Sequence, residues 1–306
     1  MTEIPLPALE GTNPLGYLAA LGVLDALAAT CPAVRLRWTD DLVPHAVVSG
    51  APDPDTLLDI LDKDRIEWTA GAIFAFPEVG APFSDAKPTS DELRRWFTFV
   101  AEQGRRPDAD HLCAIVAENA YDNNGRAKPT HLHFTAGQQQ FLSMIRTLAA
   151  STDRDRLREA IEGPWRYDSP LPSLSWDSRG ERIYAVRATN PSKEKRLGVP
   201  GADWLAFRGL TFYPVTRIPS GKLKTTACDT EWKNSAFRWP LWAASVSRET
   251  IASLVADPTL VAKDARISPA VLTARGISSV RQSKIRRSDQ GGYGSFGAAE
   301  TLASAR

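Results

Sequence analysis

The sequence predicts an α+β fold in which helices precede strands. Apolar residues recur at helical spacing in most segments up to about residue 163, whereas short alternating runs with more Trp and Pro follow. The composition of the 306 residues, 43% hydrophobic and 24% charged, is that of a globular protein. We therefore expect a helix-rich part at residues 1–163. A β-rich, basic part with a mixed, mostly antiparallel sheet should follow at residues 164–306, and the two can form one continuous domain.

The first helix is predicted at residues 14–29. Asn13 suits the N-cap, and Pro14 suits the first helical position, where no backbone N–H is needed. The segment is apolar on most sides, so we expect it to be buried. Further helices are predicted at residues 52–64, 91–103, 153–162, 201–208 and 248–256.

Strands are predicted where short apolar runs alternate with polar residues. They are expected at residues 34–38, 45–49, 130–134, 174–176, 182–188, 210–215, 223–228, 237–242 and 281–287. Asp122-Asn123-Asn124-Gly125 predicts a turn, and the Pro- and Gly-rich segment 77–90 predicts a loop. The pattern at residues 111–121 does not decide between helix and strand. The Gly-rich tail at residues 290–297 should be mobile.

Several classes of protein are excluded by simple patterns. No apolar run is long enough for a membrane span, and the N-terminal residues do not have the pattern of a secretory signal. Cys31, Cys113 and Cys228 are far apart, which fits a reduced, cytoplasmic protein. The sequence Gly292-Tyr293-Gly294-Ser295-Phe296-Gly297 matches a dinucleotide-binding pattern, but only nine residues follow it. We therefore expect no cofactor and no membrane partner.

Charge is distributed unevenly along the chain. The net charge is +1, yet residues 1–110 contain 9 Lys and Arg against 18 Asp and Glu, and residues 111–306 contain 28 against 18. Such an asymmetry indicates an anionic partner for the later part, most often a nucleic acid. The alternative is that both signs form ordinary solvated surface and pair within the fold.

The first candidate contact with nucleic acid is a helix start at Thr135-Ala136-Gly137. A helix N-terminus presents free N–H groups to a phosphate, and the following Gln138 and Gln139 can hydrogen-bond sugar or base edges. The alternative is a polar helix start whose apolar residues, among them Phe141 and Ile145, belong to the core.

The second candidate is the basic loop at residues 190–196. Its flexible side chains can follow a phosphate backbone, and we expect contacts from Asn190, Lys193, Lys195 and Arg196. The alternative is a solvated loop without a ligand.

The third candidate is the basic strand near the C-terminus. Lys284, Arg286 and Arg287 stand close in sequence to Tyr293 and Phe296, which combines positive charge with stacking groups, as single-strand binders do. The alternative is an ordinary edge strand protected by positive charge.

A metal site is a competing hypothesis. On a strand, His131 and His133 at spacing i, i+2 would face the same side, and Asp122 or Glu118 could complete the ligands. This arrangement would suit a metal-dependent nuclease or hydrolase. The alternative is that both histidines are structural.

Four segments together resemble a known family. They are residues 11–22 (GTNPLGYLAALG), 134–139 (FTAGQQ), 204–214 (WLAFRGLTFYP) and 237–242 (FRWPLW). The order of these segments and their residue patterns resemble those of the accessory and large-subunit-like proteins of type I-G (formerly I-U) CRISPR systems. The resemblance extends from about residue 9 to residue 242, and this sequence is short for a complete large subunit.

The resemblance implies a non-catalytic, nucleic-acid-binding subunit of an RNA-guided, Cascade-like surveillance complex in prokaryotic antiviral defence. Such a subunit lies near the 5′ end of the guide RNA, helps recognise the short motif beside the target, and steadies the opened strands. Its partners would be guide RNA, target DNA, the other subunits and a recruited helicase-nuclease, which performs the cleavage. A third hypothesis is a scaffold whose Trp-rich second part docks other subunits and touches no nucleic acid.

Overall fold

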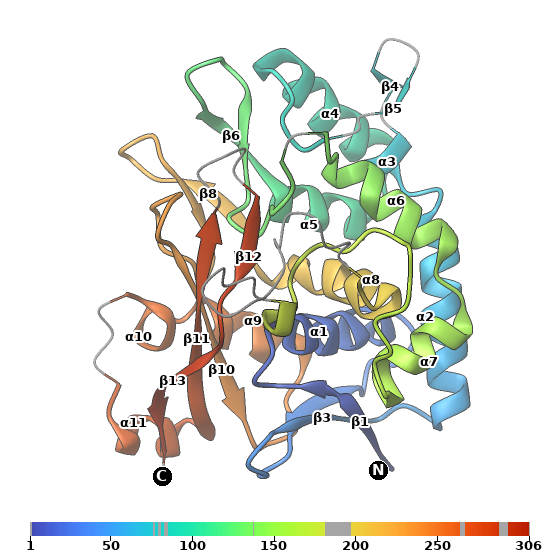
Figure 1. Cartoon of the computed structure of the whole chain (residues 1–306), viewed down its shortest axis with the longest axis vertical. Coiled ribbons are helices and arrows are strands. Elements are labelled where there is room, and N and C mark those ends of the chain that lie inside the picture. Colours follow the sequence, from blue (N-terminus) through green and yellow to red (C-terminus); the bar gives the residue numbers. More distant parts are fainter. Residues whose placement is uncertain are drawn as a thin grey trace, which may run out of the picture.

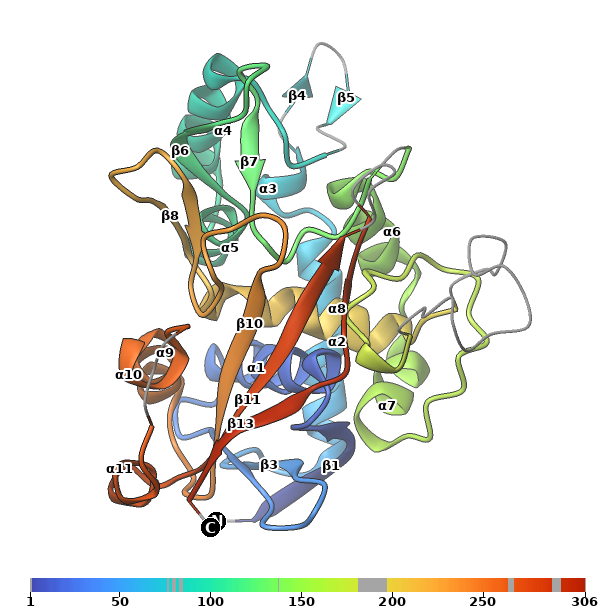
Figure 2. The ribbon, with the colours of Figure 1, turned by 60° about the vertical axis from the view of Figure 1, so that its left-hand side comes forward.

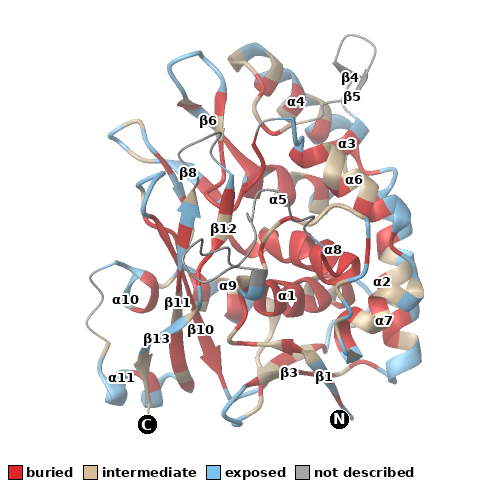
Figure 3. Cartoon of the chain, in the orientation of Figure 1, coloured by how far each residue is buried: buried red, intermediate tan, exposed pale blue. Residues whose placement is uncertain are grey.

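Two buried helices, α1 (Pro14–Ala28) and α8 (Pro200–Gly209), form the centre of the computed structural model (Figure 1). Both are buried on nearly all sides (Figure 3). A methyl group on Gly22 would overlap the carbonyl oxygen of Leu205, and one on Gly209 would overlap that of Leu18. Glycine is therefore needed at the crossing, because only a residue without Cβ lets the two backbones approach so closely.

The structure describes residues 2–75, 77–78, 81–82, 85–136, 138–180, 197–263, 267–287 and 293–305. Helices make up 42% and strands 24%, in mostly antiparallel small sheets, so the predicted α+β class is confirmed. The main hydrophobic cluster includes residues from both sides of residue 163. No described helix has the length and apolar character needed to cross a membrane.

Helix α1 begins as the sequence predicts. The side chain of Asn13 accepts a hydrogen bond from the N–H of Leu15 (3.2 Å), and Pro14 occupies the first turn. The other helices are α2 (Pro54–Trp68), α3 (Ala72–Ala75), α4 (Ser90–Gln103), α5 (Arg106–Ile115), α6 (Phe141–Ser151), α7 (Arg154–Glu162), α9 (Arg248–Ala256), α10 (Pro258–Val261) and α11 (Pro269–Ala274), with 3₁₀ turns η1 (Ser178–Gly180) and η4 (Leu210–Phe212). The undecided segment 111–121 is the end of α5 followed by strand β6.

A four-stranded sheet lies on one side of the central helices, and α2 and α7 lie on the other (Figure 1). In this sheet, β11 (Ile277–Arg287) pairs antiparallel with β10 (Ala236–Trp242), β12 (Gly294–Phe296) and β13 (Glu300–Ser304), and Figure 2 shows β10 and β11 running side by side. A second antiparallel sheet has the order β1 (Glu3–Glu10), β3 (His45–Ser49), β2 (Arg35–Trp38).

Three two-stranded hairpins complete the structure. They are β4 (Pro77–Glu78) with β5 (Ala81–Pro82), β6 (Val116–Tyr121) with β7 (Ala127–Pro129), and β8 (Val215–Arg217) with β9 (Leu223–Thr225). The last two hairpins lie side by side (Figures 1 and 2). A small separate hydrophobic cluster of Ala117, Ala120, Val215 and Leu223 holds them together.

Several predicted elements are wrong. Residues 130–134 are irregular, because the hydroxyl of Thr225 on β9 accepts a hydrogen bond from the N–H of His131 (2.8 Å) and holds this segment outside a ladder. Residues 174–176 form no strand, and residues 210–212 form a 3₁₀ turn. The predicted strand 182–188 lies outside the described residues. Within the predicted mobile tail, residues 294–296 form β12.

Candidate functional site

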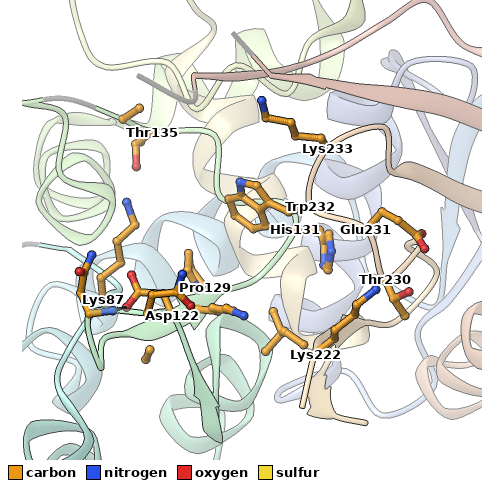
Figure 4. A pocket seen from close by; sticks show the side chains of 16 residues that line it. Lys87, Asp122, Pro129, His131, Thr135, Lys222, Thr230, Glu231, Trp232 and Lys233 are labelled. Carbon is orange, nitrogen blue, oxygen red and sulfur yellow. Dashed lines mark hydrogen bonds between the residues drawn. The ribbon is translucent and has the colours of Figure 1, made fainter. Parts of the chain in front are cut away.

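A large pocket opens between the β6–β7 and β8–β9 hairpins and the loop that follows β9. Its volume is about 910 Å³. It is lined by the turn of the first hairpin, by Lys222 and Leu223, by residues 230–233, and by Thr135 and Ala136. Figure 4 shows Asp122 on one side of it and Thr230 and Glu231 on the other. We call this space the hairpin pocket. The Asp122–Gly125 turn is formed as predicted, with the Asp122 carboxylate accepting from the N–H groups of Asn124 and Arg126 (2.8 and 3.0 Å).

A second hollow of about 670 Å³ lies along the outer end of β11. Residues 282 and 284–287 of this strand line it together with the adjoining residues 233–236 and Lys263. We call it the strand groove. Lys233 lines both the hairpin pocket and the strand groove, so the two hollows adjoin.

Positive side chains dominate both hollows. Lysines line the hairpin pocket at Lys87, Lys128, Lys222 and Lys233. In the strand groove the corresponding residues are Lys233, Lys263, Lys284 and Arg286. The carboxylates of Asp122 and Glu231 line the hairpin pocket, and that of Asp229 lines the strand groove. Asp229 already pairs with the buried Arg238 (2.7 Å). Lys222, Lys263 and Lys284 are exposed and form no ion pair with any residue that the structure describes. The surface therefore offers a net positive potential to an anionic ligand.

Other cations of the later chain pair with carboxylates of the early chain. Arg154 on α7 pairs with Asp55 (3.0 Å) and Asp59 (2.7 Å) of α2. Arg248 on α9 pairs with Asp25 of α1 (2.7 Å). Part of the charge asymmetry along the sequence thus serves internal pairing between early carboxylates and later arginines. Among the cations that line the two hollows, Lys87 pairs with Asp85 (3.5 Å), whereas Lys222, Lys263 and Lys284 form no ion pair with a described residue.

Arg287 and Trp232 join the wall of the hairpin pocket to β11. The Arg287 guanidinium donates to the carbonyl oxygens of His131 (2.8 Å), His133 (3.0 Å) and Trp232 (3.2 Å). It also lies 3.6 Å from the centre of the Trp232 ring. Burial lowers the pKa of Arg287 to about 10, so the group keeps its charge at neutral pH. Because protein partners occupy this guanidinium, we assign Arg287 a positioning role beside the predicted contacts Lys284 and Arg286.

The two histidines do not share one face. His131 bonds through Nδ1 to the hydroxyl of Thr225 (3.0 Å), and burial together with the Arg287 charge lowers its pKa to about 4. His133 is buried and bonds through Nε2 to Asp85 (2.9 Å) and Thr135 (3.0 Å). Burial alone would raise the pKa of Asp85, yet its hydrogen bond with His133 lowers it below the ordinary value.

These contacts give the paired histidines structural partners. Among the residues that the structure describes, no group of three His, Cys, Asp or Glu side chains could hold a metal ion. Glu118 is exposed on β6, and Asp122 serves the hairpin turn. The predicted strand that would have aligned the imidazoles is also not formed.

The predicted helix start at Thr135 is wrong, and this changes the setting of Gln138 and Gln139. Helix α6 begins at Phe141, whose N–H donates to the carboxylate of Asp85 (3.3 Å), 56 positions earlier in the sequence. Gln138 and Gln139 are exposed and line a separate polar groove with residues 170–173. Among the described residues of this motif, Thr135 and Ala136 line the hairpin pocket.

The remaining predicted contacts divide into two groups. Asn190, Lys193, Lys195 and Arg196 lie outside the described residues, so they stay predictions. Of the two aromatic residues predicted beside the basic strand, Tyr293 is exposed, whereas Phe296 is buried against Phe134 with ring centres 4.9 Å apart. Phe296 therefore belongs to the core.

Sequence reasoning missed several residues of the site, among them Lys222, Trp232, Lys233 and Lys263. Lys222, the turn with Trp232 and Lys233, and Lys263 are separate in the sequence and are brought together by the fold. The one available signal was Glu231-Trp232-Lys233-Asn234, in which a large aromatic residue stands alone in a polar turn. A comparison with models of protein families gives no match, and neither does one with curated proteins.

Proposed function

We propose that this protein is a non-catalytic, nucleic-acid-binding subunit of an RNA-guided CRISPR surveillance complex. The observation that carries the proposal is the adjoining pair of lysine-lined hollows, the hairpin pocket and the strand groove. A lysine ammonium is a compact charge on a flexible stem, which suits contacts with successive phosphates. The four-segment resemblance supplies the cellular setting: guide RNA, target DNA, the other Cascade-like subunits and a recruited helicase-nuclease.

The arginines and the lysines of the later chain have different surroundings, and this difference supports phosphate binding by the lysines. Arg154 and Arg248 are held by carboxylates of the early chain, while Lys222, Lys263 and Lys284 are exposed around the two hollows. When an exposed lysine neutralises a phosphate, a counterion condensed on the nucleic acid is released. This release is the main source of nonspecific affinity for nucleic acid. The same residues would hold the backbone of guide or target strands, while base pairing with the guide reads the sequence.

A binding role fits the pocket chemistry better than catalysis. His131 is the histidine that lines the hairpin pocket, and its low pKa keeps it neutral at physiological pH. Its Nδ1 bonds the hydroxyl of Thr225, and its ring lies beside that of Trp232, so both contacts serve the structure of the pocket wall. A general base near pH 7 would need a pKa close to that value and a free nitrogen toward the substrate.

The proposal is tested with a lysine variant and a matched control. The test variant is Lys222→Ala, Lys263→Ala and Lys284→Ala together. The control variant replaces Lys63, Arg95 and Arg106 with Ala. These residues are exposed away from the two hollows, and their replacement removes the same formal charge. We expect the test variant to bind RNA and DNA oligonucleotides roughly tenfold or more weakly at moderate salt, and the control to bind like the wild type.

Purification of the tagged chain with the other subunits separates the remaining hypotheses. The proposal expects guide RNA and the other subunits to co-purify with the wild type. A wild-type chain that binds neither RNA nor DNA but retains the subunits would overturn it in favour of the docking scaffold. Cleavage of an oligonucleotide on addition of Mn²⁺ or Mg²⁺ would overturn the non-catalytic assignment.

A further inference from the structure

We propose that the hairpin pocket takes a single-stranded segment and that Trp232 stacks on one of its unpaired bases. This inference rests on the proposed function and adds to it the kind of strand that the pocket accepts. It assigns to Trp232 the preference for a single strand over a duplex.

Trp232 is set apart from the other tryptophans of the chain. Seven of the nine are less than 2% exposed, and Trp165 is half-buried. Trp232 is 39% exposed and lines the hairpin pocket. An indole ring of this size is normally drawn into the core, because burial of its apolar surface is favourable. Its place at the pocket wall points to a ligand with a flat, apolar face.

The ring is held in place before any ligand arrives. The Arg287 guanidinium lies over it, 3.6 Å from the ring centre, and donates three hydrogen bonds to backbone carbonyls, one of them that of Trp232 itself. The His131 ring lies beside it, with centres 5.6 Å apart. A ring fixed in this way loses little conformational freedom on binding, so stacking on it is more favourable. The cation also makes the stack an Arg–aromatic platform of the kind that single-strand binders use.

The surroundings of the ring suit a nucleotide. Lys222 and Lys233 line the same pocket and can neutralise the phosphates on either side of a stacked base (Figure 4). The exposed amides of Asn123 and Asn124 reach the pocket from the hairpin turn and can hydrogen-bond a base edge. The volume of about 910 Å³ is enough for one or two nucleotides.

A single strand fits this arrangement better than a duplex. In a duplex, neighbouring base pairs cover both faces of each base, so a ring on the wall of a pocket cannot stack on one without unstacking the helix. An unpaired strand presents its base faces freely, and every base has such a face. RNA and DNA single strands share this chemistry, and the test separates them.

The experiment titrates the protein with oligo-U, oligo-dT and a duplex of equal length, roughly 12 nucleotides. Intrinsic tryptophan fluorescence is a direct readout, because a stacked base quenches the exposed Trp232 while most other tryptophans are buried. We expect strong quenching by single strands and weak quenching by the duplex. Trp232→Ala should bind single strands about ten- to a hundredfold more weakly, with duplex binding changed less than about twofold.

Three variants guard against a purely structural effect. Trp232→Phe keeps an aromatic face and should restore most of the single-strand affinity. Trp232→Leu covers Arg287 with apolar surface but has no π face, so it should bind as weakly as Trp232→Ala. Trp165→Phe is the matched control, because Arg179 lies 4.7 Å over Trp165 in a similar pair outside the pocket; it should keep wild-type affinity and quenching.

The outcomes distinguish a failure of the proposed nucleic-acid-binding function from a failure of the stacking role of Trp232. If the wild type binds no nucleic acid, the proposed function fails. If the wild type binds but Trp232→Ala or Trp232→Leu binds single strands equally well, the function stands and the stacking inference is overturned. A higher affinity for oligo-U than for oligo-dT assigns the site to RNA, the reverse assigns it to DNA, and both support stacking.

Discussion

Arg208 on α8 and Asp25 on α1 form a buried ion pair across the two central helices, with 3.0 Å between Nη2 and Oδ2. Their side chains are only 3% and 7% exposed. The same guanidinium donates to Asp64 of α2 (2.9 Å) and lies over Trp68. Burial alone would raise the pKa of Asp25, but the positive charge of Arg208 holds it below its ordinary value. A charged carboxylate is thus maintained in the centre of the fold.

Replacement of Arg208 by Met should strongly destabilise the protein, because it leaves Asp25 as a buried charge with one fewer partner. We expect a loss of about 3–5 kcal/mol in the free energy of unfolding, measured by urea denaturation. The double variant with Asp25→Asn should lose less than the sum of the two single changes, since the unpaired charge is removed. A loss of under about 1 kcal/mol in Arg208→Met would show that the pair is not needed at the helix crossing.

Stability should fall as the pH drops below the ordinary pKa of histidine. The pKa of His131 is lowered from 6.5 to about 4 by burial and by the charge of Arg287. Between these pH values His131 binds a proton in the unfolded chain but not in the folded chain. The contribution of His131 to the free energy of unfolding is therefore fully present above pH 6.5 and declines toward pH 4. Urea denaturation at several pH values should show a shallower decline for His131→Gln. An identical decline in this variant would remove His131 as a cause.

Asp85 should stabilise the start of α6. Its carboxylate accepts the N–H of Phe141 and bonds the buried His133, so Asp85→Ala removes the acceptor of the Phe141 N–H and one of the two Nε2 partners of His133. We expect a loss of about 1–3 kcal/mol in the free energy of unfolding. Asp85→Asn keeps one acceptor oxygen and should recover part of this loss. Equal stability of Asp85→Ala and the wild type would contradict the assigned role.

Elements with local signals could be predicted from the sequence. The Asn13-Pro14 pair defines the start of α1, and the alternation at residues 281–287 correctly indicated the end of β11. Strand β1 was not predicted, and its Pro5 and Pro7 are residue types that are rare in strands. They are tolerated there because β1 lies at the edge of the described sheet, next to β3.

The candidate site was harder to predict, because its contacts join distant parts of the chain. The helix expected at Thr135 starts instead at Phe141, where Asp85 supplies the capping carboxylate from 56 positions away. The charge asymmetry directed attention to the later part of the chain, but it could not separate arginines used in internal pairs from exposed lysines. Trp232 is typical of a core residue by type, and only its position in the fold shows that it lines a pocket.

The salt dependence of binding tests the central claim most directly. For a single-stranded oligonucleotide, the slope of log affinity against log salt reports the number of phosphates neutralised. We expect a steep slope for the wild type and for the control with Lys63, Arg95 and Arg106 replaced. The variant with Lys222, Lys263 and Lys284 replaced should have a slope shallower by about 2. The same slope in all three proteins would contradict the account, because the lysines around the two hollows would then touch no phosphate.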